Sequence, residues 1–216
     1  MTAALVTTYN EADTIGALVA GLKEHVDHVL VVDDPRTTDN TEAIAAAFGA
    51  STLVDIGAHG IGPCLIAGLK YLRGQRVVVI DAGGSHSPEA IPGMLRLEAW
   101  DVVIGSRFVP GAAYHGNPRR AKASRAYSRL CSRRTGHDIK DWTSGYRVYS
   151  PRAVAAILAR PPAATMHGWQ PQALAACLAA ECVVGERPIT YRAGRSSMNR
   201  KVAREAIGAL RGLSCS

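Results

Sequence analysis

Residues 77–89 read VVVIDAGGSHSPE, in which four consecutive β-branched residues stop at Asp81. Two further apolar runs also stop at polar or small residues: residues 30–32 at Asp33 and Asp34, and residues 102–104 at Gly105, Ser106 and Arg107. Continuous runs of this kind are typical of parallel strands buried on both faces, and open α/β sheets bind ligands beyond the carboxyl ends of such strands. The sequence therefore predicts one sheet edge that offers carboxylates for a metal ion or a ribose and an arginine for phosphate.

Along the first half of the chain, apolar runs alternate with stretches of helical spacing, which is typical of βαβ units and a parallel sheet. We expect strands at residues 3–8, 29–32, 52–54, 76–80, 102–104 and 183–191. We expect helices at residues 13–25, 41–48, 118–134, 152–159 and 171–180, and another that ends near residue 72 after a glycine-rich turn. The predicted fold class is α/β, with a mostly parallel central sheet flanked by helices. We expect one domain over residues 1–216, with a nucleotide-type half at 1–107 and a more variable half at 108–216.

Composition narrows the class of protein. The chain has 216 residues, of which 47% are apolar and 20% charged, as in ordinary globular domains. Its five cysteines form no Cys-x-x-Cys pair, so neither a disulfide framework nor a zinc site is indicated, and a reduced, cytoplasmic setting is expected. Residues 1–10 lack a basic leader segment, and no apolar stretch reaches the roughly 18 residues of a membrane span. We expect a cytoplasmic protein that is soluble or peripheral on the membrane.

Positive charge is concentrated in one segment. The net charge is +7, and residues 102–137 contain no Asp or Glu but eight basic residues: Arg107, Arg119, Arg120, Lys122, Arg125, Arg129, Arg133 and Arg134. Such a segment indicates an anionic partner, which could be a phosphate, a lipid headgroup or a nucleic acid. Nucleic acid is disfavoured because only 6% of the residues are aromatic and no motif for reading bases is present.

A helix over residues 118–134, with Asn117 as its N-cap and Pro118 in its first position, would separate these charges into two faces. Arg120 and Ser124 share one face with Tyr127 and Cys131, which suits a phosphate site at the edge of the core. The opposite face carries the four residues that we call the basic stripe: Lys122, Arg125, Arg129 and Arg133. The stripe faces either solvent or an anionic bilayer, at which each basic side chain is worth about 1 kcal/mol.

Asp81 is the candidate metal ligand. A carboxylate at the end of a buried strand can bind Mg²⁺ or Mn²⁺, which in turn neutralises a diphosphate leaving group. The alternative is that Asp81 caps a turn or a helix. His86, in the same stretch, is either a further ligand or a solvated loop residue.

Short motifs occur in a fixed order over nearly the whole chain. They are Thr8-Tyr9-Asn10-Glu11; Val32-Asp33-Asp34 with Asp39-Asn40-Thr41; Gly60-Ile61-Gly62 with Gly68; Asp81-Ala82-Gly83 with Pro88-Glu89; Gly105-Ser106-Arg107-Phe108; Arg120 with Ser124; Asp141-Trp142-Thr143-Ser144-Gly145-Tyr146-Arg147; Glu186-Arg187-Pro188-Ile189; and Gly194-Arg195-Ser196-Ser197-Met198. Each motif is short, but their ordered co-occurrence resembles the family 2 glycosyltransferases. The similarity is closest to the branch of polyprenol-phosphate mannose synthases.

This resemblance implies a GT-A fold, a nucleotide-diphosphate-sugar donor and transfer with inversion to a polyprenyl phosphate. GDP-mannose is the first choice of donor and a UDP-sugar the next. The implied donor-binding residues are Thr8, Tyr9, Glu11 and Asp33 for the base and ribose, together with Asp34, Gly60, Asp81, Ala82 and Arg195. The resemblance further implies that Asp81 holds the metal, that Arg107 lies between the two substrates, and that Arg120 and Ser124 receive the acceptor phosphate.

Three places depart from the family pattern. The family's metal motif, Asp-x-Asp followed two residues on by Gln, reads Asp81-Ala82-Gly83 and then Ser85. We therefore expect either a weaker metal site or one in which the donor phosphates and water hold most of the ion. The family's late Ser-Lys pair reads Ser196-Ser197, for which Arg195, Arg200 or Lys201 would supply the charge, and the carboxylate of its Phe-Gln-x-Glu motif reads Gln172.

The acceptor decides whether a general base is needed. A phosphate oxygen is already anionic near neutral pH, so its attack needs positioning and leaving-group stabilisation more than a base. A hydroxyl acceptor would need a base, for which Asp141 is the candidate in the second half, although it could equally organise its loop as a hydrogen-bond acceptor.

Other functions stay open or are disfavoured. One open alternative is a family member that acts on a small soluble acceptor in specialised metabolism, and another is a non-catalytic subunit that binds a nucleotide-sugar. A sugar nucleotidyltransferase and a dinucleotide-dependent oxidoreductase are both disfavoured, because residues 7–10 do not form a glycine-rich phosphate loop.

Overall fold

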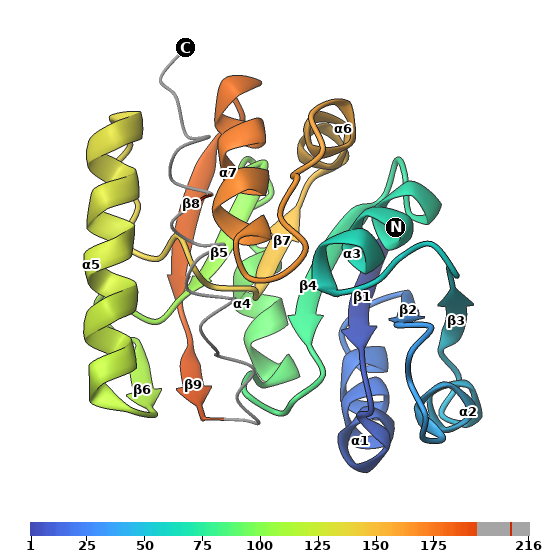
Figure 1. Ribbon diagram of the computed structural model, residues 1–216. Helices are drawn as coiled ribbons and strands as arrows, with labels where there is room; N and C mark the ends of the chain where they lie inside the picture. Colours follow the sequence, from blue (N-terminus) through green and yellow to red (C-terminus); the bar gives the residue numbers. More distant parts are fainter. Residues whose placement is uncertain (194–207, 209–216) are drawn as a thin grey trace.

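The computed structural model describes residues 1–193 and residue 208. Their main sheet has seven strands in the order β3-β2-β1-β4-β7-β5-β8, and a separate two-stranded sheet pairs β6 with β9 (Figure 1). The strands are β1 (Thr2–Thr8), β2 (His28–Asp33), β3 (Ser51–Val54), β4 (Arg76–Asp81), β5 (Val102–Ser106), β6 (Ala113–His115), β7 (Arg147–Tyr149), β8 (Val184–Pro188) and β9 (Thr190–Arg192). Within the main sheet only β7 is antiparallel to its neighbours, so the predicted mostly parallel sheet is confirmed.

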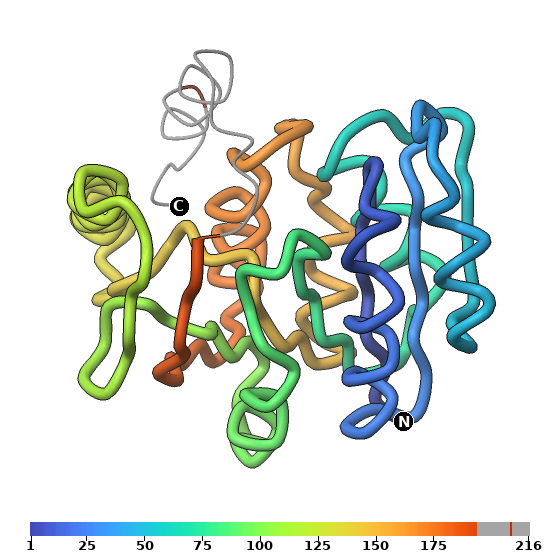
Figure 2. Tube along the Cα trace, turned by 90° about the horizontal axis from the view of Figure 1, so that it is seen from below, coloured from blue at the N-terminus to red at the C-terminus, as the bar shows by residue number. Residues whose placement is uncertain are grey.

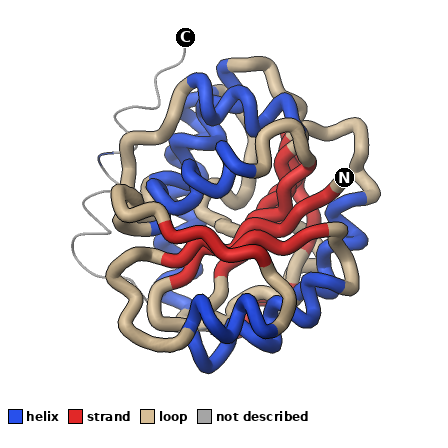
Figure 3. The backbone as a smooth tube through the Cα atoms, turned by 90° about the vertical axis from the view of Figure 1, so that its right-hand side faces the viewer, coloured by secondary structure: helices blue, strands red, loops and turns tan. Residues whose placement is uncertain are grey.

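Helices cover both faces of this sheet (Figure 3). They are α1 (Ala12–Lys23), α2 (Thr41–Ala47), α3 (Ile61–Tyr71), the short 3-10 helix η1 (Pro88–Ala90), α4 (Ile91–Leu95), α5 (Pro118–Thr135), α6 (Pro151–Ala159) and α7 (Trp169–Ala179). Because strand side chains alternate, Leu5 joins a core with α3, α6 and α7, whereas its neighbour Val6 joins a second core with α1, α2 and α4. Both faces of β1 are therefore buried, which explains why the apolar runs are continuous.

Strand register brings the predicted acids to one edge. Thr8 at the end of β1 is the partner of Asp33 in β2, and Thr7 is the partner of Asp81 in β4. The acids that follow two separate apolar runs thus lie on either side of β1, at the carboxyl ends of three parallel strands.

Helix α5 lies beyond β8, at the end of the sheet opposite β3 (Figures 1 and 2). Its start agrees with the prediction, because the side chain of Asn117 accepts a hydrogen bond from the backbone N–H of Arg119, and Pro118 occupies the first turn. Gly136 ends the helix with a φ of 75°, a left-handed conformation that favours glycine. Among the described residues, no helix combines the length and apolar character needed to cross a bilayer.

Two features of the second half differ from the prediction. The single strand expected at residues 183–191 was wrong, because β8 ends at Pro188 and the chain continues as β9 in the other sheet. Between them, the backbone N–H of Ile189 donates to the carbonyl of Ser106. Strand β7 was not expected, since three residues are too few to show a periodic pattern. Its insertion between β4 and β5 draws the 141–147 motif toward the end of β4.

Candidate functional site

The first part of the site lies at the ends of β1 and β2. The Asp33 carboxylate accepts hydrogen bonds from the hydroxyls of Thr8 at 2.7 Å and Thr37 at 2.8 Å. Burial raises the pKa of Asp33, and these two hydrogen bonds oppose the rise. The threonines therefore hold a largely buried carboxylate, 4% exposed, in a fixed orientation at the sheet edge.

Asp34 links this edge to the loop that precedes α3. Its oxygens accept from the guanidinium of Arg36 and from the backbone N–H of Gly60 at 2.8 Å. Burial disfavours the charged form, but the hydrogen bonds and charge of Arg36 outweigh it and lower the pKa of Asp34 to about 2. The guanidinium of Arg36 also lies over the ring of Tyr9, 5.6 Å from its centroid, and Tyr9 as a residue is 54% exposed. An aromatic face is thus available beside the buried acids.

Asp81 lies at the end of β4 with a half-exposed side chain. The place where a Cβ of Gly145 would lie is 3.1 Å and 3.2 Å from the Asp81 carboxylate oxygens and 3.3 Å from the side-chain nitrogen of Gln170. A glycine at position 145 therefore lets the Asp81 carboxylate approach the loop before β7. Ala82 belongs to the buried core, so any contact of this residue with a ligand would be through its backbone.

His86 is buried beside Asp81, so the expectation of a solvated loop residue was wrong. Its ring lies 5.2 Å from that of Tyr146 and 5.5 Å from that of Tyr191, and its Nδ1 is 3.8 Å from the Asp81 carboxylate. Burial lowers the pKa of His86, and the charge of Asp81 opposes this. The sequence alone does not indicate that Tyr191 of β9 packs against His86.

The second part of the site is an ion pair between Arg107, just after β5, and Asp141. Three donors of Arg107 reach the Asp141 carboxylate: its backbone N–H at 3.0 Å, Nε at 2.7 Å and Nη2 at 2.7 Å. Asp141 has no exposed surface. Burial opposes its charge, but the hydrogen bonds from Arg107 outweigh burial and lower its pKa. This geometry favours the loop-organising alternative over proton transfer, because both carboxylate oxygens are already occupied.

Neighbouring residues fix this ion pair in place. The carboxylate of Glu186 in β8 accepts from the backbone N–H groups of Lys140 and Asp141, at 2.8 Å and 2.9 Å. Arg147 at the end of the same motif is fully buried and donates to the carbonyls of Trp142 and Gln170, both at 2.8 Å. The 141–147 motif is therefore a rigid loop anchored at both ends.

Tyr191 in β9 connects the two parts of the site, and no motif or spacing in the sequence pointed to it. Its ring stacks on Tyr114 of β6 at 4.9 Å, and the Arg107 guanidinium lies 5.5 Å from its centroid. Burial raises the pKa of Tyr191, and the charges of Arg107, Asp81 and Arg120 all act on its hydroxyl. The Tyr191 hydroxyl thus lies within electrostatic range of Asp81 at the end of β4 and of Arg120 on α5.

The two predicted faces of α5 are present. Cys131 and Ser128 are buried, Ser124 is half-buried, and the hydroxyl of Ser128 accepts from the backbone N–H of Trp142. All four residues of the basic stripe are exposed, and none forms an ion pair within the described part of the chain.

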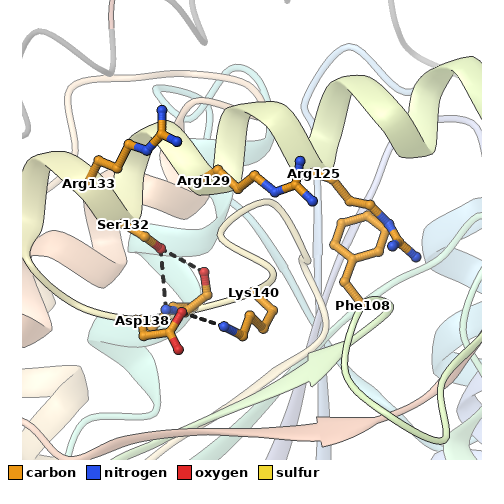
Figure 4. Close-up of a pocket in the computed structure, with 8 residues that line it drawn as sticks. Phe108, Arg125, Arg129, Ser132, Arg133, Asp138 and Lys140 are labelled. Atoms are coloured by element: carbon orange, nitrogen blue, oxygen red, sulfur yellow. Dashed lines mark hydrogen bonds and ion pairs between the residues drawn. The ribbon is translucent and has the colours of Figure 1, made fainter.

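The basic stripe also borders two hollows beside α5. One, of about 430 Å³, is lined by Phe108, Arg125, Arg129, Ser132, Arg133, Asp138, Ile139 and Lys140 (Figure 4). The other, of about 490 Å³, lies toward Tyr114 and Lys122. The Arg125 guanidinium lies 4.7 Å from the Phe108 ring centroid, so the stripe does not face bulk solvent alone.

Comparison with known sequences identifies the family. Residues 3–158 match the sequence profile of Glycosyl transferase family 2. The chain belongs to this family. One relative, the undecaprenyl-phosphate mannosyltransferase of Micrococcus luteus, is 32% identical over 220 residues, which cover 94% of this chain and 89% of the relative. The polyprenol monophosphomannose synthase of Mycolicibacterium smegmatis is 34% identical over 166 residues, covering 68% of this chain and 61% of the synthase.

Solved structures confirm the GT-A fold expected for a family 2 glycosyltransferase. The glucosyl-3-phosphoglycerate synthase of Mycobacterium tuberculosis in complex with phosphoglyceric acid superposes with a TM-score of 0.78 at 21% identity, over 99% of this chain and 79% of that one. The same enzyme with Mg²⁺ and uridine diphosphate gives a TM-score of 0.77 at 19% identity, over the same shares of the two chains. That synthase structure therefore holds a divalent cation together with a nucleotide.

Proposed function

We propose that this family 2 glycosyltransferase moves a sugar, with inversion, from a nucleotide-diphosphate sugar to a polyprenyl phosphate. GDP-mannose is the first candidate donor and a UDP-sugar the second. The names of both mannosyl-transferring relatives support a lipid-phosphate acceptor. The observation that carries this proposal is structural: Asp81 at the end of β4 and the basic residues Arg107 and Arg120 all lie within electrostatic range of Tyr191. Asp33 ends β2 at the same sheet edge, on the other side of β1. The acids would hold a cation that neutralises the anionic leaving group, and the basic residues would bind the anionic nucleophile. Transfer needs these two groups of residues close together.

Residues 1–107 would bind the donor. Thr8, Asp33 and Asp34, with Gly60 behind them, would hold the ribose, and the exposed Tyr9 ring would cover the base. Glu11 and the Ala82 backbone would complete this site, and Arg195, which lies outside the described residues, would reach the diphosphate. The half-exposed Asp81 fits a Mg²⁺ or Mn²⁺ ion held mainly by the diphosphate. When bound, this ion would neutralise charge that develops on the departing nucleotide.

Residues 108–216, together with Arg107, would bind the acceptor. Arg120 and Ser124 would take the phosphate from one side, and Arg107 would orient it toward the sugar. Asp141 would fix the guanidinium of Arg107 through its two side-chain hydrogen bonds. Since a phosphate monoester is ionised near neutral pH, no group on this chain needs to remove a proton from the nucleophile.

Turnover with defined substrates tests this function. Purified protein with Mg²⁺ or Mn²⁺ should release GDP from GDP-mannose, or UDP from a UDP-sugar, only when polyprenyl phosphate is added. Product analysis should show the sugar attached to the lipid phosphate. Turnover with a small phosphorylated or hydroxylated acceptor but not with the lipid would instead support the soluble-acceptor alternative. Nucleotide binding without turnover, across all acceptors, would support a binding subunit.

The basic stripe should dock the enzyme on anionic bilayers that contain its acceptor. Reversing Lys122, Arg125, Arg129 and Arg133 to Glu should abolish co-sedimentation with phosphatidylglycerol vesicles, because each basic residue contributes about 1 kcal/mol at such a surface. The control is a reversal of equal charge to Glu at four exposed basic residues elsewhere: Lys70, Arg73, Arg96 and Arg160. Unchanged sedimentation of the stripe variant, or equal loss in the control, would refute docking through α5.

A further inference from the structure

Gly83 stands where the family's Asp-x-Asp metal motif has its second aspartate. Within the described part of the chain, and apart from residues 82 and 84, a Cβ built on Gly83 would have one neighbour within 4 Å, the Oε1 atom of Glu11 at 3.7 Å. This is an ordinary van der Waals separation, so a side chain at position 83 would begin in contact with the Glu11 carboxylate. Glu11 therefore brings negative charge to the region that the family's second aspartate would occupy.

The chain holds Glu11 firmly in this position. Its backbone carbonyl accepts from the N–H groups of Thr14 and Ile15 at the start of α1, and its backbone N–H donates to the Thr41 hydroxyl at 2.8 Å. The Thr14 hydroxyl lies 3.1 Å from Oε2, which leaves Oε1 as the atom directed toward position 83. The carboxylate is thus oriented from its own helix, not by residues 81–83.

A second observation concerns Gln170, whose side chain approaches Gly145 beside the Asp81 carboxylate. Gln170 is only 4% exposed, and its amide oxygen has no hydrogen-bond partner among the residues that the structure describes. Its amide nitrogen lies 3.3 Å from the same Cβ position of Gly145 that the Asp81 oxygens approach to 3.1 Å and 3.2 Å. A buried amide oxygen without a partner destabilises the fold, and a cation or metal-bound water beside Asp81 is the kind of partner that such an oxygen accepts.

We propose that Glu11 supplies the second carboxylate of the metal and diphosphate site, in place of the side chain that Gly83 lacks. This inference rests on the proposed function and changes the role of Glu11 within it, from a ribose contact to a metal ligand. Asp81 at the end of β4 and Glu11 shortly after β1 then hold the cation between them. Gln170 of α7 lies beside Asp81.

Paired variants can separate this role from a ribose contact. Mn²⁺ binding is measured by electron paramagnetic resonance in the presence of GDP or UDP, whichever binds the wild-type protein more tightly. Nucleotide binding without metal is measured in parallel by calorimetry. Glu11→Gln should weaken Mn²⁺ binding by about tenfold or more, with little change in metal-free nucleotide affinity. The double variant Glu11→Gln with Gly83→Asp should regain Mn²⁺ binding, because position 83 has room for a side chain.

Glu24→Gln, an exposed position just after the end of α1, is the control for loss of one negative charge, and thermal melting verifies that each variant is folded. The inference is overturned if Glu11→Gln leaves Mn²⁺ binding unchanged, if it weakens nucleotide binding equally without metal, or if the double variant shows no recovery. In those cases nucleotide binding by the wild-type protein would still support the proposed function. Failure of the wild-type protein to bind either nucleotide would overturn both.

Discussion

The Asp81→Asn enzyme should lose sugar transfer by about 100-fold or more, the scale expected when a group that stabilises developing charge is removed. Asparagine keeps the shape of the side chain, and the half-exposed position beside Gly145 tolerates it without a packing change. Since Thr8, Asp33 and Asp34 are untouched, metal-free nucleotide binding should stay within about twofold of wild type. Steady-state rates of nucleotide release, with and without polyprenyl phosphate, measure the effect.

Glu98→Gln provides the matched control for Asp81→Asn, because it removes one carboxylate charge at an exposed position outside the site. Its rate should equal that of the wild type. If Asp81→Asn transfers sugar at a wild-type rate, the role of Asp81 as the carboxylate at the leaving group is wrong.

Asp141→Ala should destabilise the fold by about 3–5 kcal/mol, the usual cost of removing one partner from a buried ion pair. The substitution leaves the Arg107 guanidinium, whose side chain is only 12% exposed, without the carboxylate that accepts its Nε and Nη2 hydrogens. Chemical denaturation at neutral pH measures the free energy of unfolding. Asp138→Ala, on the same loop but 83% exposed, should change it by less than about 0.5 kcal/mol.

The same ion pair predicts a pH dependence. The pKa of Asp141 is lower in the folded protein than its ordinary value of 3.8, so its stabilising contribution is fully present above that value. The contribution is lost as the pH falls below 3.8 and through the folded pKa, because the unfolded chain then binds the proton more readily. Asp141→Asn should therefore have a flatter stability profile on the acid side than the wild type. Parallel acid-side profiles would show that the carboxylate is not held ionised by Arg107.

The position of the acids at one sheet edge could be predicted because the sequence signals for it are local. Buried parallel strands need continuous apolar runs, so Asp33 and Asp81 could be recognised as the residues at which such runs end. The parallel arrangement then requires those ends to share an edge, and the register of β1 with β2 and β4 confirms it. The faces of α5 were also predictable, since helical periodicity alone separates Cys131 from the basic stripe.

The rest depended on contacts between distant segments. Nothing near Tyr191 in the sequence indicates that β9 pairs with β6 and brings its ring between Tyr114 and His86. The pairing of Asp141 with Arg107, separated by 34 residues, likewise follows from the insertion of β7 between β4 and β5. The sequence therefore identified the motif residues but not the chemical role of each. A carboxylate's partners determine whether it binds a proton, a cation or an arginine, and those partners come from distant segments.

A crystal structure of the protein with a nucleotide-sugar and Mg²⁺ or Mn²⁺ tests the central claim most directly, since that claim places Asp81 beside the donor diphosphate. We expect the Asp81 carboxylate to contact the ion, or a water bound to it, with the diphosphate on the other side of that ion. A donor complex in which Asp81 points away from the nucleotide, with neither an ion nor a water between them, would contradict the account.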